Sequence, residues 1–322
     1  MSIKRLSGAH VPHSKNTTSS VPERMPISGK VTIPMAMHIG APCTPAVNVG
    51  DLVKVGQVIG EPGGFVSSPI HASVSGKVTA IDDIQLGSGA IVKAVVIESD
   101  GEQEIDATLA PPVVENTEQF LNAVRASGVV GLGGAGFPTS VKLSVKSRDQ
   151  VEYLILNGAE CEPFITSDLR TMLDDADYVI KSIELIRKFV GVGKVVIGIE
   201  DNKPEAIKLF TEKCKGDPDI KIEAMPAMYP QGGEKVLIYN STGRIVPEGK
   251  LPLDVGCVVL NVTTAAFIAK YMEKGIPLVE KCITVDGSAV ANPKNVIVPI
   301  GTPLEKVFEF CGGYGKEPRK IL

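Results

Sequence analysis

Tryptophan is absent from this chain, and aromatic residues make up only 5% of its 322 residues. Proteins that bind single-stranded nucleic acids commonly stack the bases on aromatic side chains, so this shortage argues against that class of partner. The formal net charge of −4 also offers no excess of positive charge to a phosphate backbone. We therefore expect no nucleic-acid partner.

Long apolar runs and paired cysteine motifs are missing as well. No stretch approaches the roughly 20 apolar residues that cross a bilayer, and the N-terminus contains no apolar segment of the secretory type. The six cysteines include no C-x-x-C pair, and the closest two, Cys257 and Cys282, are 25 residues apart. We therefore expect a chain that does not span a membrane, with reduced thiols and no zinc or iron–sulfur site of its own. A metal site formed by His10, His13 and Cys43 is the less favoured alternative.

The length predicts two or three domains, and an apolar content of 43% predicts that they have substantial cores. For residues 1–112 we expect an N-terminal arm followed by β-structure, because short Val- and Ile-rich runs alternate with Gly-containing turns. The order GDLVKVGQVIGE … PIHASVSGKVTAI resembles the barrel-sandwich hybrid fold of biotinyl and lipoyl domains. Those carriers place a lysine on the hairpin between the two halves. The corresponding EPGGFVSSPIHA has none, so we keep the fold and exclude a swinging-arm carrier.

Residues 113–250 alternate between strand and helix patterns. Asn116 or Thr117 can cap a helix that ends at Gly128. Buried strands are predicted at 151–157, 194–200 and 220–225, and helices at 168–190, 204–214 and 232–243, with a further helix at 263–275 after this range. This order predicts a Rossmann-like α/β domain with a parallel sheet and crossover helices. Residues 251–322 are expected to form a helical segment and then a small α+β unit.

A glycine-rich segment, GLGGAGFPTSVKL at 131–143, is the first candidate binding motif. Gly131, Gly133 and Gly136 satisfy the spacing G-x-G-x-x-G, which in dinucleotide-binding folds follows a strand and opens a helix. Here a predicted helix precedes the loop almost directly, so the segment is not that fingerprint. A phosphate-binding loop and an ordinary glycine-rich turn both remain open, and Lys142 favours the phosphate.

The second candidate motif, NGAECEPFITSDLRTM at 157–172, follows a predicted buried strand. Ligands of open α/β sheets bind at this end of the strands. Glu160 and Glu162 flank Cys161, and they could accept hydrogen bonds from ribose or flavin groups or be solvated loop acids. Asp168 is expected to cap the following helix rather than to contact a ligand.

These two motifs belong to a longer pattern. GLGGAGFPTSVK, NGAECEP, MYPQGGEK (228–235) and LNVTTAAFIAKYMEKG (260–275) resemble, in the same order, the NADH- and FMN-binding flavoprotein subunit of respiratory complex I. The N-terminal LSGAHVPHSK, IPMAMHIGAPCTPAVNVGDLVKVGQVIGE and HASVSGKV resemble the C subunit of the Rnf ion-translocating electron-transport complex and RnfC-like proteins. The C-terminal part resembles the ligand-binding β-grasp (SLBB) region of that family, so the resemblance covers the whole chain.

The resemblance implies sites for FMN and NADH. The glycines would cradle phosphates, Lys142 would reach the FMN, Phe137 would lie near the NADH adenine, and the other residues would line the flavin and the nicotinamide. The implied cofactor-binding residues are Gly131, Gly133, Gly134, Gly136, Phe137, Lys142, Asn157, Glu160, Glu162, Tyr229, Glu234, Asn261 and Thr264. No side chain receives a catalytic role, because the hydride would pass between the cofactors themselves.

Some positions depart from the family pattern. Leu132 stands where the family has Arg, Ala159 where it has Asp, Gly233 where it has Glu, and Leu260 where it has Asn. These departures leave open a non-catalytic scaffold that has lost its flavin.

The activity implied by the resemblance is electron transfer. FMN would take hydride from NADH, or run the reverse, and electrons would pass to iron–sulfur clusters of a membrane-bound, ion-pumping ferredoxin:NAD oxidoreductase. A protein of this kind would be cytoplasmic and peripheral on the inner face of the membrane, with the other subunits as partners and ferredoxin as an indirect one. The family usually carries a ferredoxin-like domain with [4Fe–4S] clusters after the β-grasp region, and we expect this chain to stop before it. Donation to a soluble reductase such as proline reductase remains an alternative.

Overall fold

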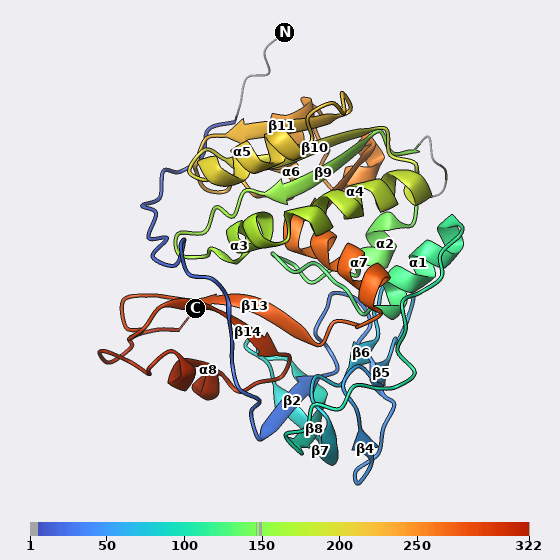
Figure 1. Ribbon diagram of the computed structural model, residues 1–322, viewed down its shortest axis with the longest axis vertical. Coiled ribbons are helices and arrows are strands. Elements are labelled where there is room, and N and C mark those ends of the chain that lie inside the picture. The colour runs from blue at the N-terminus through green and yellow to red at the C-terminus, as the bar shows by residue number, and fades with distance from the viewer. Residues whose placement is uncertain (1–5, 146, 148–149, 322) are drawn as a thin grey trace.

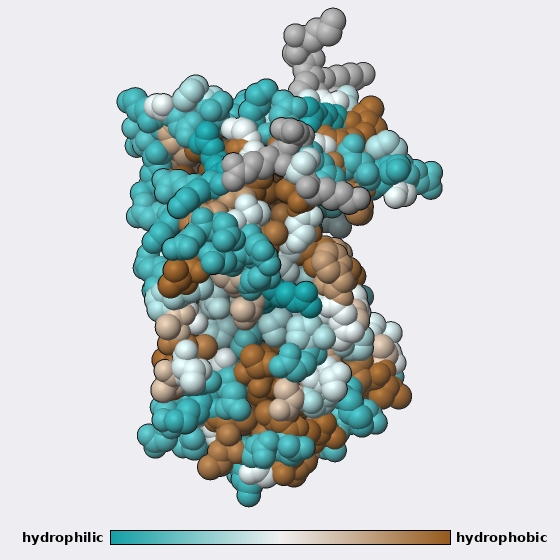
Figure 2. Space-filling model, turned by 90° about the vertical axis from the view of Figure 1, so that its right-hand side faces the viewer, coloured by the Kyte–Doolittle hydropathy of each residue, from teal (hydrophilic) through white to brown (hydrophobic). Residues whose placement is uncertain are grey.

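The computed structural model describes residues 6–145, 147 and 150–321. A β-rich barrel occupies the bottom of Figure 1, a small α+β unit lies above it, and a large α/β domain forms the top. Figure 2 views the right-hand side of that picture and shows hydrophobic residues, mixed with hydrophilic ones, gathered at the lower end. Among the described helices, none is long and apolar enough to cross a membrane.

The N-terminal barrel combines a four-stranded sheet, in the order β2-β8-β7-β4, with a three-stranded sheet, β3-β5-β6. Its strands, all paired antiparallel, are β2 (Lys30–Pro34), β3 (Thr44–Pro45), β4 (Leu52–Val53), β5 (Val58–Glu61), β6 (Ile70–His71), β7 (Gly76–Gln85) and β8 (Ile91–Ser99). Alternate side chains of β2 face the core, where Val31 and Ile33 are fully buried. The expected barrel-sandwich hybrid is confirmed.

The central domain contains a parallel sheet in the order β11-β10-β9-β12. Its strands are β9 (Tyr153–Gly158), β10 (Lys194–Glu200), β11 (Ile220–Met225) and β12 (Cys257–Asn261). Its helices are α1 (Thr117–Ala126), α2 (Thr139–Leu143), α3 (Ser167–Asp174), α4 (Ala176–Val190), α5 (Pro204–Lys213), α6 (Glu234–Thr242) and α7 (Val262–Lys274), with a 3-10 turn at Pro252–Val255. Leu154 and Leu156 pack on the face covered by α3, α4, α5 and α7, whereas Ile155 packs on the opposite face under α6. The predicted Rossmann-like domain is confirmed.

The single helix predicted for 168–190 is wrong, because the chain breaks at Asp175 into α3 and α4. Asp175 has φ −118° and ψ 20°, outside the helical region, and its carboxylate accepts a hydrogen bond of 2.6 Å from Lys270 of α7. The restart also places Asp175 and Asp177 at the N-terminus of α4, where the helix dipole favours negative charge. The apolar residues keep a helical spacing across Asp175, so the sequence pattern does not indicate that the helix is interrupted there.

β12 and α7 are part of the central domain, since β12 pairs with β9 and α7 packs against α4. The sequence grouped these elements with the segment after residue 250. The predicted boundaries themselves, 1–112, 113–250 and 251–322, remain predictions.

The C-terminal unit has a sheet in the order β1-β14-β13 and one helix. Its elements are β13 (Glu280–Val285), β14 (Lys294–Pro299) and α8 (Leu304–Phe310). The first strand, β1 (Glu23–Arg24), comes from the N-terminus and pairs in parallel with β14. Residues 6–22, which we call the N-terminal arm, run along the side of the α/β domain in dark blue in Figure 1. One chain terminus thus contacts both the central domain and the C-terminal unit.

Candidate nucleotide-binding site

The sheet order changes direction between β9 and β12, and we call the region outside the carboxyl ends of these two strands the crevice. From β9 the chain continues to β10 and β11 on one side and then returns to β12 on the other. Open α/β sheets bind ligands at such a switch point, outside the carboxyl ends of the strands. Asn157 of β9 and Asn261 of β12 lie opposite each other at this end, so two predicted site residues flank the crevice.

The glycine-rich loop lies against the N-terminus of α7, beside the crevice. The N–H of Leu132 donates a hydrogen bond of 2.9 Å to the Thr264 hydroxyl. A Cβ atom on Gly133 would lie 2.1 Å from Asn261 Nδ2, whereas one on Gly134 would meet no atom within 4 Å. Position 133 therefore requires glycine because the loop approaches Asn261 closely, and position 134 faces open space.

The amide groups of this loop are available to a ligand. Within the described part of the chain, the N–H groups of Gly133, Gly134, Ala135 and Gly136 donate no hydrogen bond to another residue, and residues 133–135 are exposed. Consecutive free amides next to a helix N-terminus form a favourable site for an anion. The loop therefore fits a phosphate group.

A buried network holds the start of α7 in place. Asn261 Oδ1 accepts hydrogen bonds from the N–H groups of Thr263 (2.9 Å) and Thr264 (3.1 Å), so Asn261 caps the helix. Asp168 accepts bonds of 2.6 Å from both Asn261 Nδ2 and the Thr263 hydroxyl, and burial raises its pKa. The expectation that Asp168 caps a helix is wrong: Thr166 holds that position in α3, and the Asp168 side chain points instead to α7, where two donors satisfy it.

Lys142 and Glu234 form an ion pair near the edge of the sheet. Lys142 Nζ lies 2.7 Å from Glu234 Oε1 and donates to the backbone oxygen of Val259 in β12 at 3.2 Å. Two residues before Glu234, the backbone oxygen of Gly232 accepts a hydrogen bond of 2.8 Å from Asn157 Nδ2. The structure thus links Lys142 to β12 and to Glu234 at the start of α6, and Asn157 to the turn before α6.

Glu160 is a buried acid, and the alternative of a solvated loop acid is wrong for it. Its backbone has φ 49°, its side chain accepts a 2.6 Å hydrogen bond from Asp168 N–H, and burial raises its pKa to about 8. The other oxygen has no hydrogen-bond partner among the described residues and lies 3.9 Å from Lys15 Nζ. Lys203 Nζ supports the loop by donating to the Ala159 oxygen at 2.6 Å. Glu162 is half-buried.

The two predicted aromatic residues are placed differently. Phe137 is half-buried, and its backbone closes the glycine-rich loop by accepting from Gly131 N–H at 3.0 Å. Tyr229 is 48% exposed and pairs through its backbone with Ala9 of the N-terminal arm. Within the described residues, neither ring makes a hydrogen bond or a ring–ring contact, so their predicted roles remain predictions.

The departures from the family pattern fall mainly on packing positions. Leu132 and Leu260 belong to the core cluster shared with α7, and Ala159 is fully buried in the cluster beneath α6. Gly233 precedes α6 as its N-cap residue. Three of the four positions therefore hold apolar side chains that pack in the cores of the central domain.

Three residues of the site were not singled out from the sequence. Lys15, Lys203 and Thr263 belong to the arm, to the turn after β10 and to the first turn of α7. Thr263 is adjacent to a predicted residue and could have been included. Lys15 contacts Glu160 across 145 positions of sequence, and a single sequence carries no signal for such a contact.

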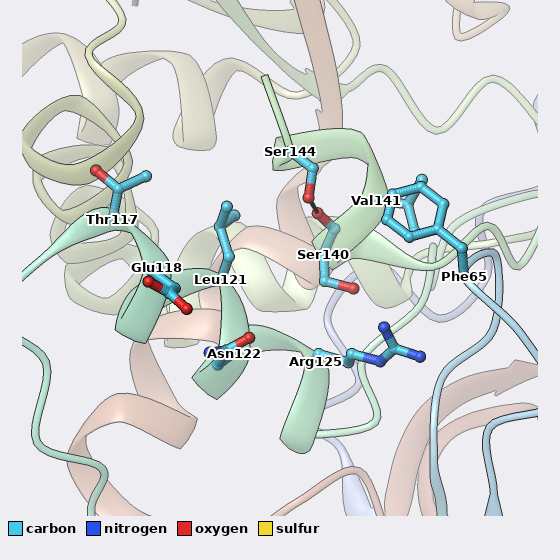
Figure 3. A pocket seen from close by; sticks show the side chains of 9 residues that line it. All are labelled: Phe65, Thr117, Glu118, Leu121, Asn122, Arg125, Ser140, Val141 and Ser144. Carbon is cyan, nitrogen blue, oxygen red and sulfur yellow. Dashed lines mark hydrogen bonds between the residues drawn. The ribbon is translucent and has the colours of Figure 1, made fainter. Parts of the chain in front are cut away.

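A separate surface pocket of about 380 Å³ lies between α1 and α2. Figure 3 shows Phe65 of the barrel, Arg125 of α1 and Ser140 of α2 around it. None of the predicted cofactor-binding residues lines it.

Comparison with protein families and known structures gives matches along the chain. Residues 4–102 match the RnfC barrel sandwich hybrid domain, residues 124–270 the Nuo51 FMN-binding domain, and residues 282–321 the SLBB domain. The chain is 46% identical to the C subunit of the Na(+)-translocating ferredoxin:NAD(+) oxidoreductase complex of Acetobacterium woodii, covering 98% of this chain and 72% of that one. It is 44% identical to the C subunit of the proton-translocating ferredoxin:NAD(+) oxidoreductase complex of Clostridium ljungdahlii, covering 98% and 70%.

Among solved structures, an NAD+-reducing [NiFe]-hydrogenase in its H2-reduced state matches with a TM-score of 0.50 and 22% identity. The match covers 62% of this chain and 39% of that chain. At this identity the likeness concerns the fold alone.

Proposed function

Because the chain belongs to the family of C subunits of ion-translocating ferredoxin:NAD(+) oxidoreductase complexes, we propose that it binds FMN and NADH and transfers electrons within such a complex. The observation that carries this proposal is the row of free amides from Gly133 to Gly136 against the N-terminus of α7. A phosphate group is the ligand that such a row suits best.

The chain's own residues would bind and orient the cofactors. The FMN phosphate would lie against the loop amides, with Asn157, Glu234 and Lys142 around the crevice that receives the rest of the flavin. Bound flavin supplies the chemistry, since it can accept a hydride and release electrons singly. The Asn261–Asp168–Thr263 network fixes the loop and helix, so that the ligand is held in one orientation.

The proposal extends to location and partners. The relatives are named as subunits of ion-translocating complexes, and the described helices include none that could span a membrane. We place the chain on the cytoplasmic, inner face of the membrane, docked on other subunits. Electrons would pass to [4Fe–4S] clusters of the complex and exchange with ferredoxin.

The test is an anaerobic titration with FMN, followed by NADH, while the visible absorbance of the flavin is recorded. Binding and bleaching support the proposal, and binding without bleaching removes NADH as the donor. If the protein does not bind FMN, the proposal is overturned and the alternative of a non-catalytic scaffold is favoured. Gly134→Ala should weaken FMN binding because its methyl group enters the phosphate site, and Gly87→Ala is the matched control because position 87 also faces open space.

A further inference from the structure

Lys281 brings a positive charge from the C-terminal unit to the glycine-rich loop. It lies in β13, which packs beneath α3 in Figure 1. A cavity of about 300 Å³ is lined by Lys281, by Gly131, Gly134 and Gly136 of the loop, and by His38 of the barrel. The barrel, the central domain and the C-terminal unit therefore meet at this cavity.

The same lysine lines a second and larger cavity of about 690 Å³, which also contains Thr263 at the start of α7. Leu132 of the glycine-rich loop lines both cavities. Lys281 thus lies between the two cavities, close to the loop and to the N-terminus of α7.

Lys281 forms no ion pair within the described part of the chain. Among the described residues, its amine makes neither a hydrogen bond nor a salt bridge. Two other cations that line the larger cavity are paired, Arg170 with Asp174 and Lys270 with Asp175.

Burial lowers the pKa of Lys281, and the negative charge of Asp168 opposes that shift. Asp168, however, already accepts hydrogen bonds from Asn261 and Thr263. An unpaired, largely desolvated amine is costly unless an anion joins it.

Lys142, the cation that the sequence suggested for the phosphate, is engaged by Glu234. Its charge is therefore largely matched within the protein. Among the described residues, Lys142 thus has an ion-pair partner near the loop and Lys281 has none.

We propose that Lys281 supplies the cation for the nucleotide phosphate held by the glycine-rich loop, so that the C-terminal unit completes the site. This inference rests on the proposed function and adds a residue and a domain to it. The ligand is a phosphate group, which belongs either to the flavin nucleotide or to the pyrophosphate of the dinucleotide.

The experiment compares wild-type protein and Lys281→Met for binding of FMN, riboflavin and ADP-ribose by isothermal titration calorimetry. Loss of a charge-assisted contact predicts that the Kd for FMN rises by about 10- to 100-fold while the Kd for riboflavin stays unchanged. A rise confined to ADP-ribose supports the inference and assigns the phosphate to the dinucleotide. Lys306→Met is the matched control, because Lys306 lies exposed on α8 of the same unit.

Several outcomes overturn the inference. Equal loss of FMN and riboflavin affinity indicates a structural role, and unchanged affinity for FMN and ADP-ribose shows that Lys281 does not contact a phosphate. If wild-type protein binds none of the nucleotides, both the proposed function and this inference fail. If it binds FMN and Lys281→Met binds FMN equally well without losing ADP-ribose, only the inference fails. Lys281→Arg should retain part of the FMN affinity, and urea unfolding of each variant reports whether it folds.

Discussion

Asp168 connects the loop after β9 to the helix that supports the glycine-rich loop. Its side chain is buried and accepts hydrogen bonds from Asn261 and Thr263, which come almost 100 positions later in the chain. A buried carboxylate in this position fixes the direction of two donors at the same time. Asp168 therefore acts by positioning other groups and need not touch a ligand.

Replacement of Asp168 by Ala should remove both acceptors and leave buried donors unpaired. We expect a loss of about 1–3 kcal/mol in the free energy of unfolding, measured by urea denaturation. Asp177→Ala removes an acid whose side chain is 88% exposed, and it should change stability by less than about 1 kcal/mol. Equal effects of the two substitutions would show that the network contributes little.

His71 gives the barrel a dependence on pH. Burial lowers its pKa to about 4 from an ordinary value of 6.5. Between pH 4 and pH 6.5, His71 is therefore protonated in the unfolded chain but neutral in the native state. The free energy of unfolding consequently falls as the pH drops from 6.5 to 4. The full effect approaches about 3 kcal/mol.

Urea unfolding of wild-type protein and His71→Gln at several pH values tests this prediction. In His71→Gln, the free energy of unfolding should lose the part of its pH dependence that His71 contributes, whatever the absolute stability of the variant. His10→Gln, at an exposed position, should keep the wild-type slope. A slope that is the same in all three proteins would contradict the assignment.

Single residues of the site were predictable where a motif surrounded them. Asn261 and Thr264 were identified from a motif, and the structure brings them to the glycine-rich loop. Lys15 and Lys281 were not, because each reaches the site from a segment more than 100 positions away. Local patterns report local neighbours, whereas these contacts depend on the tertiary fold.

At the scale of elements, the glycine-rich loop and the start of α7 act as one unit. Gly133→Ala should push Asn261 away and disturb its hydrogen bonds to Asp168 and to the helix N-terminus. We expect it to lower both FMN affinity and the free energy of unfolding, the latter by about 1–2 kcal/mol. Gly134→Ala should lower FMN affinity alone, because nothing lies within 4 Å of its added methyl group.

Flavin titration and urea unfolding of the two variants measure this difference. The prediction fails if Gly134→Ala destabilises the protein as much as Gly133→Ala, because the loop would then be uniformly sensitive. It also fails if Gly133→Ala leaves stability unchanged, which would mean that Asn261 is free to move.

The elements themselves were largely predictable from periodicity. β10 and β11 have the predicted bounds, and α1 has the predicted cap at Asn116. The break at Asp175 was not predictable, because the apolar period runs through it and the reason for it lies in the contact with Lys270 of α7. Periodicity indicates which residues face the core, but it does not show where a helix stops when no Gly or Pro marks the end.

At the scale of the whole molecule, the N-terminal arm contacts the other parts through polar groups. Lys15 donates to the backbone oxygens of Glu160 (2.7 Å) and Ile165 (2.6 Å). The Thr17 hydroxyl lies 2.6 Å from that of Thr166, and Asn295 of the C-terminal unit donates to the Thr17 oxygen at 3.2 Å. The arm therefore joins the central domain to the C-terminal unit.

Lys15→Met should detach the middle of this arm. Amide hydrogen exchange followed by mass spectrometry should show residues 6–22 exchanging about 10- to 100-fold faster, because two carbonyl contacts of a charged donor are lost. Lys77→Met, at an exposed position of β7, is the control and should leave exchange of the arm unchanged. Unaltered exchange in Lys15→Met would show that other contacts hold the arm.

The pairing of β1 with β14 also has a consequence for biosynthesis. Glu23 leaves the ribosome early, but Val296, its partner in the parallel pair, is made 273 positions later. The barrel and the central sheet can fold as they emerge, whereas the pairing of β1 must wait until β14 has been made. The pairing of β1 therefore follows the synthesis of the barrel and the central sheet, and a chain interrupted before β14 would leave β1 unpaired.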